Sequence, residues 1–360
     1  MNFGGAKMIK IKVIHKIFII FLCAAFLFLT LLNPNASKCG ITSGLLLCGN
    51  VIIPSLFPFM VFSQLLYNVI NQFRFEKIKV FLFKVFKLDF NNLLIFFTSM
   101  IGGYPVGAKL INNAYIDKQI SRHNAEILLP ICVNAGPSFV VIAIGAAMLN
   151  STVLGTILFF SELIACIELY LIFRKELNTD NISVKEPIRR SFSEIFVDSV
   201  ADSCASIINI CAFTATFSCI INVLKTIIKN KILISVITYP LEVSNTALNN
   251  KNIYLLAFII GFGGICVIFQ IISISKSFYK DIGKMLLVRI IHGVFTVINT
   301  YAILKIFKIT APTISNIGNN VLNISNNNIK ISMILIFLAL LLLISISYKK
   351  YSGSLKKDIL

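Results

Sequence analysis

Charged residues are scarce in this chain, and most of them are basic. Asp, Glu, Lys and Arg make up 13% of the 360 residues, whereas hydrophobic residues make up 57%. The mean hydropathy is +0.87, and a soluble domain cannot bury that much apolar surface. This composition excludes a soluble globular protein and predicts an integral membrane protein in contact with the lipid bilayer.

The motifs of common catalytic and metal sites are absent. No His-Glu-x-x-His, Gly-x-Ser-x-Gly or phosphate-binding loop occurs, so we do not expect an enzyme. The nine cysteines form no Cys-x-x-Cys pair, and most lie within or beside apolar runs, as packing residues do. His15, His123 and His292 are too scattered for a metal site. We therefore expect no metal and no cofactor.

The net charge of +18 invites a nucleic-acid partner, but its distribution does not fit one. Basic residues cluster at the ends of apolar runs, in segments 7–16, 74–79, 174–190 and 349–350. This is the positive-inside pattern that orients membrane proteins, and it leaves no nucleic-acid footprint. We expect no nucleic-acid partner.

Membrane-length apolar runs divide the chain. At roughly 20 residues per crossing, they predict about eight or nine spans and hairpins. No small-x-small cleavage site follows the first apolar run, so an uncleaved anchor is expected there. The predicted parts are a basic segment with this anchor, a first repeat, a charged linker, a second repeat, and a polar loop with a last transmembrane helix and basic tail: 1–40, 41–175, 176–194, 195–309 and 310–360. Within the first repeat, segment 75–90 spaces its charges through a Phe-rich stretch, which predicts an interfacial amphipathic helix.

Two apolar runs are interrupted near their middles. The first break reads Gly-Gly-Tyr-Pro-Val-Gly-Ala-Lys at 102–109, and the second reads Gly-Phe-Gly-Gly-Ile-Cys-Val-Ile-Phe-Gln at 261–270. Lipid cannot hydrogen-bond the backbone that a break frees, so breaks persist where protein or a wet cavity surrounds them. Paired breaks in two halves of a chain are typical of solute sites in secondary transporters.

The two breaks also align with each other. An offset of 161 residues sets Gly102 on Gly263, Gly103 on Gly264, Val106 on Val267 and Lys109 on Gln270. Basic residues place the N-terminus, segment 71–92 and the linker in the cytoplasm, so the repeats are expected to be inverted and their breaks entered from opposite faces. The three lysines of segment 276–284 conflict with this topology, because they would lie outside.

The first break carries the clearest candidates for a solute site. Gly102, Gly103 and Gly107 allow a tight reversal, and Pro105 cannot continue a helix. A helix restarting after Pro105 would direct its N-terminal amides, which attract anions, into the gap. Lys109 follows within one turn, and a lysine at mid-membrane costs about 2.5–3.5 kcal/mol. We expect a counter-charge or an anionic solute beside Lys109, unless a shallow hairpin lets it snorkel.

A second polar interruption comes after a helix that is expected to start near Ser121. It reads Asn-Ala-Gly-Pro-Ser at 134–138. Asn134 and Ser138 either hydrogen-bond a solute carboxylate or base edge, or repair a helix kinked around Gly136.

In the second half, Glu242 stands beside Ser244 and Asn245. A carboxylate near a broken helix binds Na⁺ or carries a proton, and the alternative is an ordinary loop acid. Four further ionisable residues lie deep in apolar runs and predict either an ion pair between the halves or a coupling site: Glu162, Glu168, Arg289 and His292.

Five segments resemble the YlbJ-type sporulation integral membrane proteins, a family related to nucleoside-recognition (Gate) domains: 55–59, 102–109, 134–139, 241–245 and 263–270. The resemblance covers about residues 40–305 and departs at 266–269, where Cys-Val-Ile-Phe replaces a more polar run. It implies a polytopic protein of endospore-forming bacteria, in the cell membrane or the outer forespore membrane. It also implies passage of dipicolinate from the mother cell toward the forespore.

Together, these observations predict an all-α, polytopic membrane protein with two inverted repeats whose broken helices or re-entrant hairpins surround a midplane site. The expected function is transport of a small anionic solute, with dipicolinate favoured. The alternatives are a nucleoside transporter of the Gate class and a non-transporting membrane assembly protein needed for sporulation; a homo-oligomer is compatible with each. The residues expected at the solute site are Gly102, Gly103, Tyr104, Pro105, Gly107, Lys109, Asn134, Gly136, Ser138, Glu242, Ser244, Asn245, Gly263, Gly264 and Gln270.

Overall fold

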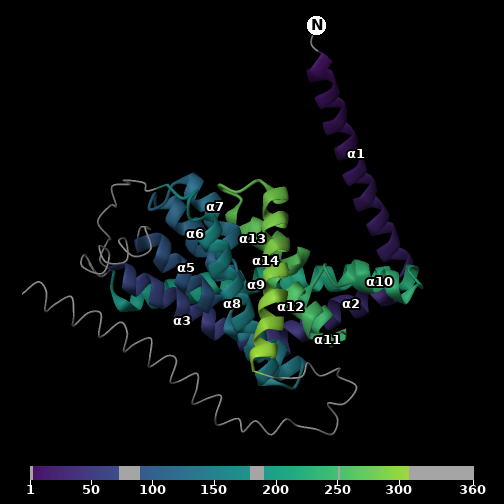
Figure 1. Ribbon diagram of the computed structural model, residues 1–360. Coiled ribbons are helices and arrows are strands. Elements are labelled where there is room, and N and C mark those ends of the chain that lie inside the picture. Colours follow the sequence, from purple (N-terminus) through teal and green to yellow (C-terminus); the bar gives the residue numbers. More distant parts are fainter. Residues whose placement is uncertain (1–2, 73–89, 179–189, 250–251, 308–360) are drawn as a thin grey trace, which may run out of the picture. The chain divides into compact units, whose positions relative to one another are not determined.

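The computed structural model describes residues 3–72, 90–178, 190–249 and 252–307, and every regular element in these ranges is a helix (Figure 1). Five of the described segments are long and apolar enough to cross a membrane: Pro34–Ile70, Thr152–Phe173, Phe192–Ile227, Ile253–Ser275 and Ile282–Ile306. The prediction of an all-α, polytopic membrane protein is confirmed. The expected interfacial helix, most of the charged linker and the segment 310–360 lie outside the described residues.

The first half begins with α1 (Phe3–Leu32), whose apolar side chains from Ile17 to Leu32 are mostly exposed, as lipid-facing side chains are. It continues through α2 (Pro34–Leu47), the π-helical turn η1 (Cys48–Ile52) and α3 (Ile53–Gln72). The remaining elements of this half are α5 (Phe90–Gly102), α6 (Tyr104–Ile116), α7 (Arg122–Cys132), the π-helical η2 (Ser138–Met148) and α8 (Thr152–Phe173).

The second half begins with α9 (Phe192–Ile227), a helix opened by a capping box between Ser191 and Glu194. Two short helices follow, α10 (Lys231–Thr238) and α11 (Val243–Asn249). The last described elements are α12 (Ile253–Phe262), α13 (Gly264–Ser275) and α14 (Ile282–Ile306).

Both predicted glycine breaks are present. At the first, Gly103 has φ 83° and ψ −174° and separates α5 from α6, which pack against each other as a hairpin. The second helix of this hairpin starts at Tyr104 with Pro105 in its first turn, and not after Pro105 as expected. At the second break, Gly263 separates α12 from α13 with φ 87°, and Gly264, the first residue of α13, has φ 75°. Positive φ values at both breaks explain why glycine stands there.

The two breaks nevertheless belong to different kinds of element. The same order of elements occurs twice: a helix pair with Tyr-Pro at its junction, a broken helix, and a long helix. In the first half these are α5–α6, α7–η2 and α8, and in the second half they are α10–α11, α12–α13 and α14. Tyr104-Pro105 of the first pair thus matches Tyr239-Pro240 of the second. The offset of 161 residues instead sets a hairpin tip on the break of a broken helix.

Helix directions correct one expectation and agree with another. The Ser277 hydroxyl, beyond the end of α13, donates to Asn112 near the end of α6, at 2.7 Å. Hence α6 and α13 run in the same direction from their breaks, and the chain leaves both breaks toward the same face, not toward opposite faces as inversion of these two breaks would require. By contrast α2 and α9, which open the two halves, are antiparallel, because Gly40 packs on Cys219 and Gly44 on Ala215. Inverted repeats require this opposition.

Two further contacts remove the conflict over the lysines of segment 276–284. An Arg122 nitrogen lies 3.1 Å from the Phe278 carbonyl oxygen, and a His123 ring nitrogen lies 2.9 Å from the Glu176 carbonyl oxygen. Segment 276–284 therefore lies at the same end of the protein as Arg174 and Lys175. The second half obeys the positive-inside rule with the topology inferred for the linker.

Candidate solute site

The breaks of both halves converge at one place in the bundle. A Cβ atom on Gly103 would lie 3.0 Å from the Gly136 nitrogen, so the hairpin tip crosses the α7–η2 break backbone to backbone. The Tyr104 hydroxyl, just past the tip, donates to the Ile260 carbonyl of α12 at 2.6 Å. This contact joins the first hairpin to the broken helix of the second half.

The turn between α10 and α11 closes the arrangement. The first amides of α13, on Ile265 and Cys266, donate to the Pro240 and Leu241 carbonyl oxygens at 2.8 and 2.9 Å. These two amides at the start of α13 are therefore used by protein backbone and do not await an anion.

Arg289 of α14 is fully buried and explains how the freed carbonyls are satisfied. Its guanidinium donates to the Phe262 oxygen at 3.1 Å, and also to the Gly261 and Val133 oxygens. A cation at the ends of α7 and α12 is favoured by both helix dipoles. The described residues show these three carbonyl contacts for Arg289 and no ion pair with Glu162.

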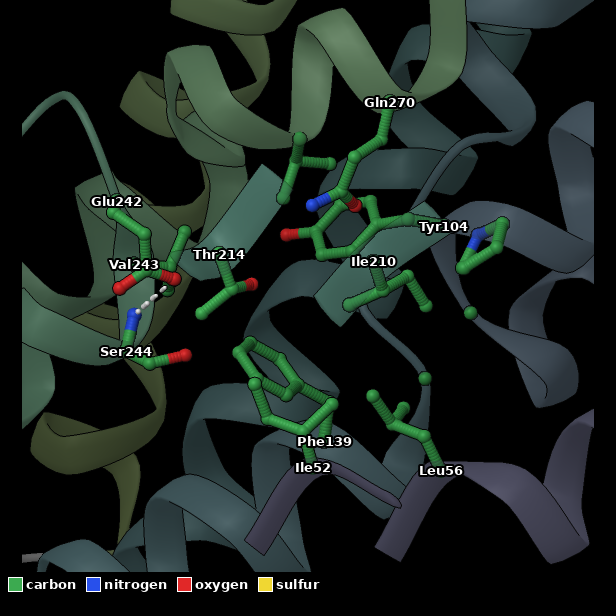
Figure 2. Close-up of a pocket in the computed structure, with 14 residues that line it drawn as sticks. Ile52, Leu56, Tyr104, Phe139, Ile210, Thr214, Glu242, Val243, Ser244 and Gln270 are labelled. Atoms are coloured by element: carbon green, nitrogen blue, oxygen red, sulfur yellow. Dashed lines mark hydrogen bonds between the residues drawn. The ribbon is translucent and has the colours of Figure 1, made fainter. Parts of the chain in front are cut away.

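A narrow cavity lies where these elements meet (Figure 2). Its volume is about 30 Å³ for the centres of water-sized spheres, which is room for about two water molecules. A solute larger than this requires the surrounding elements to move. The lining residues are Ile52, Leu56, Gly103, Tyr104, Pro105, Gly136, Phe139, Ile210, Thr214, Glu242, Val243, Ser244, Val267 and Gln270.

The polar groups of the cavity are one carboxylate and several uncharged groups. Figure 2 shows Glu242 and Ser244 on one side and Tyr104 and Gln270 on the other. A Glu242 carboxylate oxygen accepts from the Ser244 amide at 3.1 Å, and the buried Ser244 hydroxyl has no hydrogen-bond partner among the described residues. None of the described residues that line the cavity is a Lys, Arg or His. The cavity can therefore hydrogen-bond a polar solute and stack an aromatic ring on Tyr104 or Phe139.

Seven of the predicted site residues line this cavity: Gly103, Tyr104, Pro105, Gly136, Glu242, Ser244 and Gln270. Glu242 is 4% exposed, so it is not an ordinary loop acid at the surface. Sequence reasoning missed Thr214 and Ile210 of α9, because they lie in an unbroken apolar helix. The available signal was Thr214, a small polar residue within an apolar helix, which could have indicated a polar contact inside the bundle.

Four other predicted residues are glycines that pack next to the elements lining the cavity. Gly102 and Gly107 allow close packing, since a Cβ on Gly107 would lie 2.7 Å from the Cys132 oxygen. Gly263 lies against the Tyr104 ring, and Gly264 lies against Val243. Asn134 and Ser138 are buried but do not line the cavity, and the Asn245 side chain lies outside the described residues.

Lys109 has a counter-charge beside it, one of the two neighbours expected from its position in an apolar run. Its ammonium nitrogen lies 3.1 Å from a carboxylate oxygen of Asp202 on α9, and the two side chains are 26% and 37% exposed. Lys109 does not line the cavity. Its contact with a solute stays a prediction.

A wider hollow lies on the far side of the α10–α11 turn. It measures about 260 Å³ by the same measure and is lined by Ile221, Lys225, Lys231, Ile234, Ser235, Thr238, Tyr239 and Thr246. The segment 239–246 contributes residues to both hollows. This segment therefore separates a basic outer hollow from the narrow inner cavity.

The chain is 23% identical over 341 residues to the "Sporulation integral membrane protein YlbJ" of Bacillus subtilis (strain 168), covering 79% of this chain and 82% of the relative. No family model matches the chain, and no solved structure matches it. The protein is an integral membrane protein that is similar to a sporulation protein along most of its length.

Proposed function

We propose that this chain carries a small solute across a membrane of a sporulating cell, and that the solute is dipicolinate. The observation that supports transport is the convergence of helix-pair turns and broken helices from both halves on one cavity. Irregular backbone at membrane depth is typical of solute and ion sites between inverted repeats. The sporulation context comes from the similarity to YlbJ.

The outer hollow favours an anionic solute. Lys225 and Lys231 line it, and a cleft with charges of one sign raises the local concentration of counter-ions. Dipicolinate carries two carboxylates, so it would be attracted to this hollow, which lies at the end of the protein away from the cytoplasmic linker. Its passage past Glu242 then requires that carboxylate to be protonated or to turn away, because two like charges repel strongly in a dry site.

A nucleoside is the second candidate, and the inner cavity supports it. Its lining combines uncharged hydrogen-bonding groups on Thr214, Ser244 and Gln270 with a carboxylate that accepts from hydroxyl groups. Tyr104 and Phe139 offer ring faces to a base. Such a site needs no basic side chain.

Counterflow in proteoliposomes tests both candidates. Vesicles loaded with unlabelled dipicolinate or uridine are diluted into the same labelled compound, and exchange is measured without any ion gradient. We expect dipicolinate exchange, reduced about tenfold or more by Thr214→Val, since a buried hydrogen bond to a charged solute contributes about 1.5–3 kcal/mol. Thr216→Val is the matched control, because the Thr216 hydroxyl bonds its own helix at Ala212 and the residue is exposed.

Exchange of uridine alone would overturn dipicolinate as the solute and support a nucleoside transporter. If folded protein in the vesicles exchanges neither compound, the result would favour a non-transporting membrane assembly protein.

A further inference from the structure

A cluster of buried polar side chains lies behind the cavity, between the α7–η2 break, α8 and α14. Glu162 of α8 is 1% exposed, and His292 of α14 is fully buried. Asn134 and Ser138 flank the break and are equally inaccessible. None of these four lines the cavity.

Within the part of the chain that the structure describes, each of these side chains has a polar atom without a hydrogen-bond partner. One Glu162 oxygen, Oε1, accepts from the Ala135 amide at 2.7 Å, whereas Oε2 has no partner. His292 Nε2 lies 3.3 Å from the Glu162 carbonyl oxygen, and its Nδ1 has no partner. Asn134 Oδ1 and Ser138 Oγ are likewise without one. A buried carboxylate oxygen without a donor is costly, and ionisable groups inside a membrane commonly carry protons.

The carboxylate of Glu162 is connected to the solute cavity through the α7–η2 break. Its partner, Ala135, immediately precedes Gly136, which lines the cavity and crosses Gly103 backbone to backbone. The hydrogen bond from Ala135 therefore helps to hold the α7–η2 break in position against the tip of the α5–α6 hairpin. It is charge-assisted while Glu162 is ionised, and such bonds are about twice as strong as neutral ones.

The surroundings of Glu162 suit a proton better than a metal cation. Arg289 lies near the carboxylate from α14 and Tyr104 from α6, His292 of α14 contacts the Glu162 main-chain carbonyl, and Cys166 lies one turn along α8. A monovalent metal ion would leave the same net charge as a proton, but it requires several ligands, and the described residues hold no group of three or more His, Cys, Asp or Glu side chains that could bind a metal. A proton on Oε2 neutralises the carboxylate and needs no ligand shell.

We propose that Glu162 is the proton-binding site that couples solute movement to a proton gradient, with His292 beside it as the second proton acceptor. The proposal rests on the transport function proposed above. A proton that binds Oε2 converts the carboxylate to a neutral acid and weakens the Ala135 bond. The break at Gly136 then shifts against Gly103, and release of the proton on the other side restores the bond.

The test separates exchange from accumulation in the same proteoliposomes. The labelled solute is dipicolinate or uridine, whichever the wild-type protein exchanges in counterflow. We expect an imposed pH gradient to drive accumulation by the wild type. Glu162→Gln should keep counterflow within about twofold and lose at least tenfold of the accumulation, because a glutamine Oε1 still accepts from Ala135 but binds no proton.

Two variants control for folding and charge. Glu168→Gln makes the same change six residues later on α8, where the side chain bonds Asn299, and it should retain accumulation. Glu162→Asp keeps a titratable group and should retain part of it.

The outcomes are distinguishable. No counterflow by the wild type would overturn the transport function itself. Counterflow without any effect of the pH gradient, accumulation driven by a sodium gradient instead, or full accumulation by Glu162→Gln would each overturn the coupling role while leaving transport in place.

Discussion

Gly103 and Gly136 touch through their backbones: a Cβ on Gly136 would lie 3.0 Å from the Gly103 nitrogen and 3.1 Å from the Ile101 oxygen. The first residue belongs to a hairpin tip and the second to a broken helix. Their contact sets the spacing of two elements that line the cavity. Neither position has room for a side chain, and Gly103 also holds a backbone conformation that is essentially restricted to glycine.

We therefore expect Gly136→Ala and Gly103→Ala to lower thermal stability in detergent and to abolish solute exchange. Overpacking typically costs about 1–3 kcal/mol, and the backbone strain at Gly103 adds a similar amount. Gly49→Ala is the control, since a Cβ there meets nothing within 4 Å. Normal melting and exchange by Gly136→Ala would contradict the described crossing.

Lys109 and Asp202 form a partly exposed ion pair between α6 and α9. We expect Lys109→Gln or Asp202→Asn to lower stability by about 0.5–1 kcal/mol and to reduce exchange. The charge swap, Lys109→Asp with Asp202→Lys, should restore both if the pair acts only between the helices. Restored melting with lost dipicolinate exchange would show instead that Lys109 contacts the solute.

The two lysines of the outer hollow should affect anions selectively. Lys225→Gln combined with Lys231→Gln should raise the KM for dipicolinate roughly threefold or more at low ionic strength. The effect should shrink in high salt, and uridine exchange should not change. Lys276→Gln with Lys280→Gln removes the same charge at the other end of the protein, so an equal effect from that pair would exclude a local role.

The helix directions predict the sidedness of thiol labelling. In a cysteine-free background, Lys118→Cys and Ser277→Cys should react with an impermeant reagent from one side, because the ends of α6 and α13 adjoin. Asn150→Cys, in the turn between η2 and α8, should react from the other side. Labelling of positions 118 and 277 from opposite sides would refute the parallel arrangement of α6 and α13.

The sequence predicted what local chemistry decides. Gly-Gly-Tyr-Pro specified a helix break with positive φ at Gly103, and the apolar runs specified the spans. Ser121 also caps α7, as expected. These features depend on neighbouring residues and on lipid, which a single sequence displays.

The sequence did not predict which elements correspond or meet. Glycine pairs are few and similar, so Gly102-Gly103 aligned with Gly263-Gly264 although one forms a hairpin tip and the other lies inside a broken helix. The contact of Arg289 with Val133 spans 156 residues and leaves no local pattern. The burial of Glu242 was open for the same reason, because it depends on α9 and α13 packing over a turn that is only weakly apolar.

The position of Arg289 also limits how the protein can open. One guanidinium joins the end of α7 to the end of α12 through three carbonyl oxygens, and separating those ends would expose several charge-assisted bonds at once. The two broken helices should therefore travel as a single rigid body. Alternating access would then require the α5–α6 hairpin and the α10–α11 pair to move, each in turn opening the cavity, while the two broken helices stay fixed relative to each other.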